Sequence, residues 1–335
     1  MCCQSDDTSL KRIIHMGDTP NVVWNLYFAS EFKNLINNKN NPELSLSNNE
    51  IFIFQCIFRD FNASSIHFNS KNAKIMHSEC FFDSCRSEKG PALYIFNCDC
   101  SVVQRRFCTK NCYASIFGHH TYCCLKTLET RCLNYIEDCS AIECGDTTGS
   151  SVIYQESGKM KILFANISDN KSGGSTALSV RSQNFEKLAF STIVRNSASY
   201  IATISLNEGS SYNIEDCNIL NNYQGDEISG AIFLRSSLNM NGCTIFENTG
   251  SEYMFYIEGP FQVTIRNSFY DDLSSNQEIT TDNCMETSKF NSLNHYDSYD
   301  CAVHPVCIKV KCSLRKCSFG NGFIHNTLIV LISKR

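Results

Sequence analysis

The sequence predicts an all-β fold, a single-stranded right-handed parallel β-helix (β-solenoid) of about nine to ten coils with about 26 residues in each coil. Three observations support this prediction. The stretch at 213–250 repeats its own pattern after about 26 residues, apolar residues alternate around the repeated position, and glycine or asparagine turns separate the short apolar runs. A pattern that recurs at a fixed shift of this size indicates units that stack on one another.

The repeated position, which we call the anchor, is a cysteine in five of nine coils. Most neighbouring anchors are separated by nearly the same interval, and the interval between Phe107 and Cys139 is the longest. Three residues before the anchor, seven of the nine residues are apolar, which supports the alignment independently of the cysteines. Five residues after it, cysteine recurs in three coils and asparagine in two. The anchors are Cys56, Cys80, Phe107, Cys139, Asn166, Thr192, Cys217, Cys243 and Ser268.

Alternation of apolar residues around the anchor is typical of a strand with one buried face. A second apolar run follows a glycine-containing bend in several coils, at 92–95, 152–154, 177–180 and 231–234. Two or three short strands in about 26 residues are too few for a four-stranded propeller blade, and the helical half of a leucine-rich repeat is missing. One coil of a β-solenoid fits, with its strands about 4.8 Å from those of the next coil.

The repeat divides the chain into three regions. Residues 51–273 form the β-helix repeat domain, and residues 1–50 form an N-terminal cap with a short helix at 30–38 and a partial coil around Trp24. Residues 274–335 form a C-terminal cap and a Cys-rich tail. Its apolar run at 323–332 is half the roughly 20 residues that span a bilayer, so a last strand is favoured over a truncated anchor.

Composition limits the partners. The 335 residues carry a net charge of −5, and no basic cluster longer than Arg105-Arg106 occurs in the body of the chain, so nucleic acid is not expected to bind. The first residues, MCCQSDDTSLKR, lack the apolar stretch of a secretory signal peptide. The expected partner is a protein or glycan, and neither membrane association nor a particular oligomer is predicted.

The 21 cysteines are interpreted mainly as stacked interior thiols, with disulfides and a metal site as alternatives. Zinc sites usually contain pairs of the form Cys-x2–4-Cys. The nearest local cluster is Cys98-x-Cys100 with Cys123-Cys124. No metal ligand and no cofactor is predicted.

The segments CNILNN and CTIFEN, together with the elements GGSTAL and SGAIFL, resemble right-handed parallel β-helix proteins of the pectin-lyase-like superfamily. They are also similar to the Cys- and Asn-rich surface proteins of protists, especially trichomonads. The resemblance covers about 50–300, and 283–301 resembles the segment that closes such arrays. It implies display at the cell surface or outside the cell and a role in adhesion.

Candidates for catalysis are few. A glycosidase needs two carboxylates beside the scissile bond, and a lyase needs a basic group near calcium-binding acids. Asp271-Asp272 and His119-His120 are about six coils apart, roughly 25–30 Å, which is too far for one site. We interpret them as solvated turn acids and a surface-loop histidine pair. Other acids, Asp83 and Asp169, share a position with Asp271 but lie several coils apart.

Two further features concern the surface. The coil with the longest spacing has its extra residues within 113–131, and such insertions usually emerge as loops on a binding face, so this segment is the first candidate for ligand binding. Asn-x-Ser sequons occur at Asn62, Asn166 and Asn170, as expected by chance in a chain this rich in these residues.

The resulting hypothesis is a non-enzymatic surface or extracellular protein whose stacked faces form a binding platform, with no catalytic residue named. The alternative is a carbohydrate-active enzyme of the same fold, a polysaccharide lyase or glycoside hydrolase. A degenerate gene product without any display is the third possibility.

Overall fold

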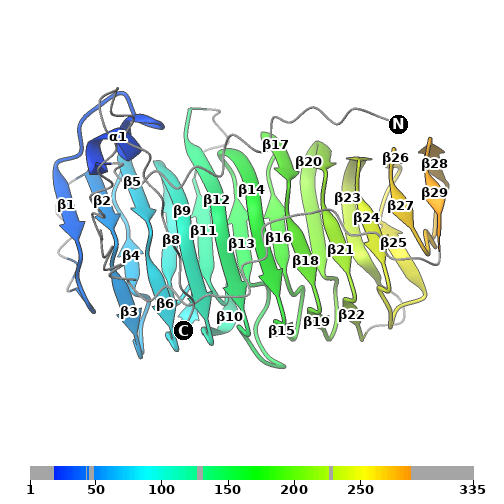
Figure 1. Ribbon diagram of the computed structural model, residues 1–335, viewed down its shortest axis with the longest axis horizontal. Coiled ribbons are helices and arrows are strands. Elements are labelled where there is room, and N and C mark those ends of the chain that lie inside the picture. The colour runs from blue at the N-terminus through cyan, green and yellow to red at the C-terminus, as the bar shows by residue number, and fades with distance from the viewer. Residues whose placement is uncertain (1–18, 43, 45–48, 127–130, 226–228, 288–335) are drawn as a thin grey trace, which may run out of the picture. The chain divides into compact units, whose positions relative to one another are not determined.

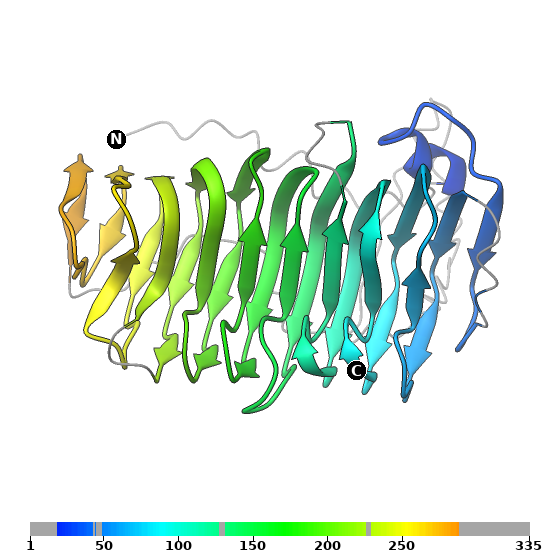
Figure 2. The same ribbon diagram turned by 180° about the vertical axis from the view of Figure 1, so that it is seen from behind.

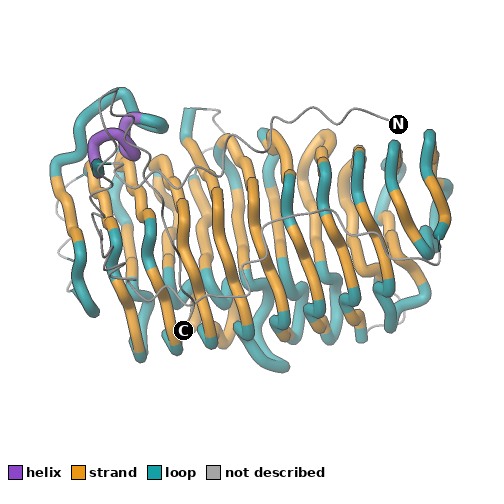
Figure 3. The backbone as a smooth tube through the Cα atoms, viewed as in Figure 1, coloured by secondary structure: helices purple, strands orange, loops and turns teal. Residues whose placement is uncertain are grey.

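The computed structural model describes residues 19–287, with gaps at 43, 45–48, 127–130 and 226–228. Parallel strands stack side by side along this part of the chain, and the described residues contain one helix, α1 (Pro20–Asn25) (Figure 1). The view from behind shows the same stacking on the other side (Figure 2). The tube drawing shows strands joined by short turns (Figure 3). The predicted parallel β-helix is therefore confirmed, with about eight turns.

Each coil has three faces. The first face is built from β1 (Asn34–Asn37), β2 (Glu50–Phe54), β5 (Ala73–Ser78), β9 (Cys100–Lys110), β12 (Leu133–Ile142), β14 (Lys159–Ser168), β17 (Phe185–Ala189), β20 (Ile204–Glu215), β23 (Gly230–Asn241), β26 (Val263–Arg266) and β28 (Ile279–Asp282).

The second face continues β9, β12 and β14 past the first corner. It also contains β3 (Ile57–Arg59), β6 (Phe81–Asp83), β18 (Thr192–Val194), β21 (Asn218–Leu220), β24 (Thr244–Phe246), β27 (Phe269–Tyr270) and β29 (Met285–Glu286).

The third face contains the first parts of β20 and β23, together with β4 (Ile66–Phe68), β8 (Leu93–Cys98), β11 (Thr121–Leu125), β13 (Ile153–Glu156), β16 (Leu178–Arg181) and β25 (Tyr253–Ile257). Short strands between the second and third faces form two small sheets: β7 (Arg86–Lys89) with β10 (Tyr113–Phe117), and β15 (Lys171–Ser172) with β19 (Ser197–Ala198) and β22 (Tyr223–Gln224).

The interior stacks like residues on like. The rings of Phe58 and Phe82 lie parallel, with centroids 4.9 Å apart. Fourteen described cysteines are free thiols, most of them buried, whereas Cys108 is disulfide-bonded. Stacked interior thiols therefore predominate in the described part of the chain, where cysteine acts as a small buried hydrophobe.

The strand register corrects two of the anchors. Cys139 pairs with Ala165, not with Asn166, and Ser191 stands one residue before Thr192 in the next coil. The anchors from Cys139 to Cys243 are then evenly spaced along the chain. The sequence alignment places the anchor one residue too late in these two coils because alanine and serine replace the cysteine.

The corrected register reveals a continuous column five residues after each anchor. Asparagine amides stack in it from coil to coil, with each Nδ2 donating to the Oδ1 of the next at 2.9 to 3.0 Å. We call this column the asparagine ladder: Asn170, Asn196, Asn222 and Asn248. Cys85, Cys112 and Cys144 precede it at the same position in earlier coils.

The N-terminal cap differs from the expected one. The predicted helix at 30–38 is wrong, because strand β1 lies there and pairs with β2. The helix is instead α1, with Pro20 at its start, where a partial coil was expected. Pairing with the open edge of β2 outweighs the weak helical preference of 30–38, and proline is well suited to the first turn of a helix.

At the other end, the ladder of strands extends beyond the expected boundary at 273. Strands β28 and β29 pair with β26 and β27, and Cys284 occupies the anchor position after Ser268. The expected tail and its apolar run at 323–332 lie outside the described residues. Within the described part, no helix is long and apolar enough to cross a membrane.

Candidate functional site

One outward-facing column of side chains on the third face is aromatic at both ends and small in the middle. β8, β11 and β13 place Tyr94, Tyr122 and Tyr154 in register, with ring centroids 5.7 and 4.9 Å apart. β16 and β20 continue the column with Ser179 and Ser205. β23 and β25 then restore aromatic residues, Phe233 and Tyr256, with centroids 5.9 Å apart.

The two serines leave a groove between the aromatic stacks, with a volume of about 440 Å³. Tyr154 forms one end of the groove together with Phe117, whose ring centroid lies 5.5 Å away. Phe233 forms the other end, three strand spacings further, or about 14 Å. Further lining residues are Ser150, Ser175, Ile201 and Ser229.

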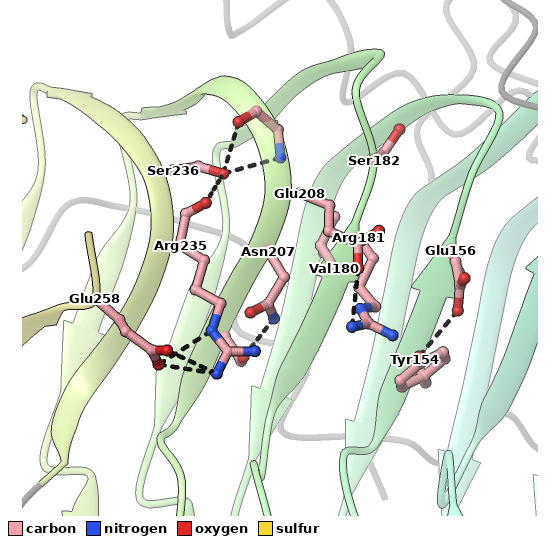
Figure 4. A network of polar contacts seen from close by, with 12 residues as sticks. Tyr154, Glu156, Val180, Arg181, Ser182, Asn207, Glu208, Arg235, Ser236 and Glu258 are labelled. Carbon is pink, nitrogen blue, oxygen red and sulfur yellow. Dashed lines mark hydrogen bonds and ion pairs between the residues drawn. The ribbon is translucent and has the colours of Figure 1, made fainter. Parts of the chain in front are cut away.

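A column of charged and amide side chains runs beside the groove, two residues after each member of the first column and therefore on the same side of the strands. Its members are Glu156, Arg181, Asn207, Arg235 and Glu258 (Figure 4). Each arginine is paired with a carboxylate: Arg181 with Glu208 at 2.9 Å, and Arg235 with both oxygens of Glu258 at 2.9 to 3.0 Å.

A bulge in β20 sets the position of the central part of this column. The pairing with β23 is interrupted between Asn207 and Ser211, and Glu208 has a positive φ of 61°. The buried Tyr212 hydroxyl donates to the Asn207 carbonyl from inside the coil and accepts the Ser182 amide at 3.2 Å. The bulge therefore rests on a fixed interior contact.

Gly209 completes this bulge. A Cβ at this position would lie 2.6 Å from the Tyr212 ring, so a larger residue does not fit. On the neighbouring strand β23, the Ser236 hydroxyl donates to the Gly209 carbonyl and accepts the Gly209 amide, both at 2.8 Å (Figure 4).

The groove supplies hydrogen-bonding groups and ring faces. Asn207 donates to the Ser205 hydroxyl at 2.8 Å, and the Arg235 guanidinium lies over the Phe233 ring at 5.3 Å. Burial and the nearby Glu156 carboxylate raise the pKa of Tyr154, so its hydroxyl stays protonated and donates to Glu156 at 3.0 Å. Exposed ion pairs contribute roughly 0–1 kcal/mol, so a ligand can compete for the arginines at little cost.

The lining offers little for bond cleavage. Among its described residues, Glu258 is the one carboxylate, and Arg235 binds both of its oxygens. The described lining contains no histidine, cysteine or aspartate. This set is suited to binding by hydrogen bonds and ring contacts.

The histidine pair expected on a surface loop lies in the interior, so that interpretation is wrong. His119 and His120 are fully buried, because the chain enters β11 directly after them. The His119 Nδ1 accepts the Ala114 amide at 3.0 Å. His120 joins a polar cluster inside the coil, together with Gln104 and His77.

The aspartates considered for catalysis make local contacts, and Asp272 accepts the Ser274 amide at 2.8 Å. Asp83 faces Arg59 at 3.8 Å, Asp169 binds Arg195 through two oxygens at 2.7 Å, and Asp271 accepts the Glu247 amide at 2.7 Å. With the corrected register, Asp169 lies four residues after its anchor, so it does not share a position with Asp83 and Asp271.

The cysteine cluster considered for zinc is divided by the strand alternation. Cys98, Cys100 and Cys123 are buried inside, whereas Cys124 lies on the outward side and is half-buried. Within the described residues, no group of three or more His, Cys, Asp or Glu side chains is arranged to hold a metal ion.

The long coil at 113–131 forms strands β10 and β11 instead of an extended loop, although 127–130 lie outside the described residues. It contributes Phe117 to the groove and Tyr122 to the aromatic stack. Sequence reasoning missed the remaining groove residues because they became a set only when the third-face strands were aligned. The run at 204–207, which supplies Ser205 and Asn207, was not recognised as a strand.

Comparison with models of protein families, with curated proteins and with solved structures found no match to this chain.

Proposed function

We propose that this protein is a non-enzymatic binding protein that presents its third face at a cell surface or outside the cell, and that the groove binds a glycan. The observation that carries the proposal is the gap of two serines, Ser179 and Ser205, between two stacks of aromatic rings. A sugar presents apolar C–H faces to rings and hydroxyl groups to polar side chains. The aromatic ends and the polar column of the groove match these two kinds of surface.

Two further points support the proposal. The Cys-x-hydrophobic-x-x-Asn segments resemble the pectin-lyase-like superfamily and, more narrowly, protist surface arrays, which favours display and adhesion. The groove also lies on aligned strands, and a site on rigid elements positions ligand groups well.

The test is a glycan array probed with the full chain and with Ser179→Tyr. A tyrosine at Ser179 extends the stack from Tyr154 and fills half of the floor, so binding to any captured glycan is expected to fall at least tenfold. The matched control is Thr264→Tyr, which places the same side chain on an outward position of the first face. Equal binding by Ser179→Tyr and the unaltered chain would exclude the groove as the site.

The same experiment tests the absence of catalysis. Bound glycans are incubated with the full chain and analysed for shorter products by mass spectrometry. Intact glycans are expected, and cleavage lost in Arg235→Ala or Glu258→Gln would replace the binding proposal with an enzymatic one.

A further inference from the structure

The three Asn-x-Ser sequons lie in different environments. Asn62 is exposed on the turn between β3 and β4, whereas Asn166 is only 9% exposed and Asn170 is fully buried. An N-linked oligosaccharide needs a side-chain amide that faces solvent after the chain has folded. The structure therefore distinguishes motifs that look equivalent in the sequence.

Asn170 is excluded by its hydrogen bonds. It belongs to the asparagine ladder, and its Nδ2 donates to the Asn196 Oδ1 at 2.9 Å and to the Ala141 carbonyl at 3.1 Å. Both amide hydrogens are used, and the Oδ1 accepts the Cys144 amide at 2.8 Å. A glycosidic bond would replace one of these hydrogens and place a sugar ring inside the coil.

Asn166 is excluded by burial within a strand. It lies inside β14, paired on one side with Ser140 and on the other with Thr192. The small exposed fraction of its side chain leaves no room for an attached sugar.

Asn62 meets the requirement. Its neighbour Ala63 is also exposed, and the Ser64 hydroxyl of the motif donates to the Lys89 carbonyl at 2.9 Å. We propose that Asn62 is an N-glycosylation site of this protein and that Asn166 and Asn170 remain unmodified. The proposal rests on the display outside the cell stated above, because that route exposes the chain to the modifying enzyme.

The reaction transfers an oligosaccharide from a lipid-linked pyrophosphate donor. A bond forms between the Asn62 Nδ2 and the anomeric carbon, and the bond from that carbon to the pyrophosphate oxygen breaks. The lipid pyrophosphate leaves with the electron pair, and Nδ2 loses one proton to solvent.

Asn62 lies beside a strand that does not line the groove. The next strand, β4, carries His67 in the same outward column as the tyrosines, and three strand spacings separate His67 from Tyr154. This distance is about 14 Å along the stack. The modified turn therefore lies next to a strand outside the groove.

The test is secretion of the full chain, behind an added cleavable signal sequence, from a glycosylating eukaryotic cell. Peptide N-glycosidase treatment in ¹⁸O water followed by peptide mass spectrometry measures occupancy at each sequon. Occupancy is expected at Asn62 and at neither of the other two, and Asn62→Gln is expected to abolish the shift in electrophoretic mobility. A folded secreted product with sugar on Asn166 or Asn170, or without sugar on Asn62, would overturn the proposal.

Two variants separate this proposal from the proposed function. Ser179→Tyr is expected to retain occupancy at Asn62 even if it loses the groove ligand, and Asn62→Gln is expected to bind that ligand as the unaltered chain does. A chain that binds no glycan but is modified at Asn62 would contradict the proposed glycan binding in the groove and leave the proposed glycosylation site supported.

Discussion

At the level of single residues, the asparagine ladder satisfies every polar group that it buries. The Oδ1 of Asn196 accepts the backbone amide of Asn170 at 3.2 Å and its Nδ2 at 2.9 Å. The Nδ2 of Asn196 donates to the Ile167 carbonyl at 2.9 Å and to the Asn222 Oδ1 at 3.0 Å. Because a buried polar group without a partner costs about 1–3 kcal/mol, the ladder depends on each of its members.

Replacing Asn196 with alanine is therefore expected to lower the free energy of unfolding by about 3 kcal/mol, since it leaves the buried Asn170 amide groups without their acceptor. Urea unfolding followed by circular dichroism measures the loss. The matched control is Asn241→Ala, because the Oδ1 of this exposed asparagine accepts the Asn267 Nδ2 at 2.8 Å on the surface, where solvent can replace the lost bond. Equal losses in the two variants would show that burial of the ladder does not determine its contribution.

A second set of buried polar residues lies between coils near the N-terminal end. The Gln104 Oε1 lies 3.2 Å from the Nε2 atoms of both His77 and His120, and the His120 Nδ1 lies 2.5 Å from the Thr109 hydroxyl. Phe82 and Phe107 surround the imidazoles. Both histidines are therefore held neutral in an apolar environment.

This cluster predicts loss of stability in mild acid. Burial lowers the pKa of His77 to about 4, and burial together with the charge of His77 lowers the pKa of His120. The unfolded chain has ordinary histidines with pKa of about 6.5, so it binds protons that the folded chain does not, and stability falls as the pH decreases below about 6.5. Each such histidine contributes about 1.4 kcal/mol per pH unit until its folded pKa is reached.

Urea unfolding at pH 7, 6 and 5 measures this slope. The variant His77→Gln keeps a polar side chain but does not titrate, so its slope is expected to be smaller by about one histidine. An unchanged slope would show that His77 is protonated in the folded state or that it is not buried in solution.

At the level of elements, α1 covers an apolar strip on the outside of the first coils. Trp24 is fully buried, with ring centroids 4.5 Å from Phe28 and 5.9 Å from Phe52. The strip continues through Met76 and Val103, which face outward on β5 and β9. The helix therefore covers an apolar part of the first face. In later coils, the equivalent outward positions carry polar residues.

Truncation of Trp24 to alanine is expected to lower the free energy of unfolding by about 3–5 kcal/mol, as for other large aromatic residues in cores. Leu26→Ala in the same segment is the control, because this side chain is 62% exposed and its loss is expected to cost little. Thermal and urea unfolding compare the two. Similar stabilities would mean that α1 does not hold the first coils together.

The same elements show what sequence alone can predict. Strand order and the parallel stack followed from the repeat period and the alternation around the anchor, because both reflect a face that must be buried. The register was misplaced by one residue where Ala165 and Ser191 replace cysteine, and this hid the ladder members Asn170 and Asn196. The spacing of residues along the chain does not reveal such a substitution.

The candidate site was less predictable for a related reason. Ser179 and Ser205 are ordinary residues in the sequence and acquire meaning only from the aromatic rings on neighbouring strands, which lie a whole coil or more away in the chain. The buried histidines were misassigned because a glycine-histidine pair in a long coil is typical of a loop. The location of α1 was missed because its apolar contacts lie on strands far along the chain.

At the level of the whole described β-helix, strand pairing joins each coil to its immediate neighbours, so stability is expected to be approximately a sum of coil and interface terms. The coils from Cys139 to Cys243 are equal in length and present equivalent surfaces to one another. One coil in this region can therefore be removed without changing how its neighbours stack. The groove is different, because it requires the four strands β13, β16, β20 and β23 to lie side by side in this order.

Deletion of residues 191–216 removes one complete coil and tests both statements. Phe190 is then followed by Cys217, so the register is kept and Asn170 meets Asn222 in the ladder. The shortened chain is expected to fold with a β-sheet spectrum and to unfold cooperatively in urea. It is also expected to lose groove binding, because Ser205 and Asn207 are removed and Phe233 then follows Ser179 directly in the outward column.

The control is a deletion of residues 191–203, which removes half a coil, including β18 and β19, and joins Phe190 at the first corner directly to Ile204 at the start of the third face. Every later side chain would then face the wrong neighbours, so this chain is expected to aggregate or to remain unfolded. Folding of both deletions would show that register is not what holds the coils together. Unfolding of both would show that the coils are not independent units, and binding retained by the whole-coil deletion would place the ligand outside the groove.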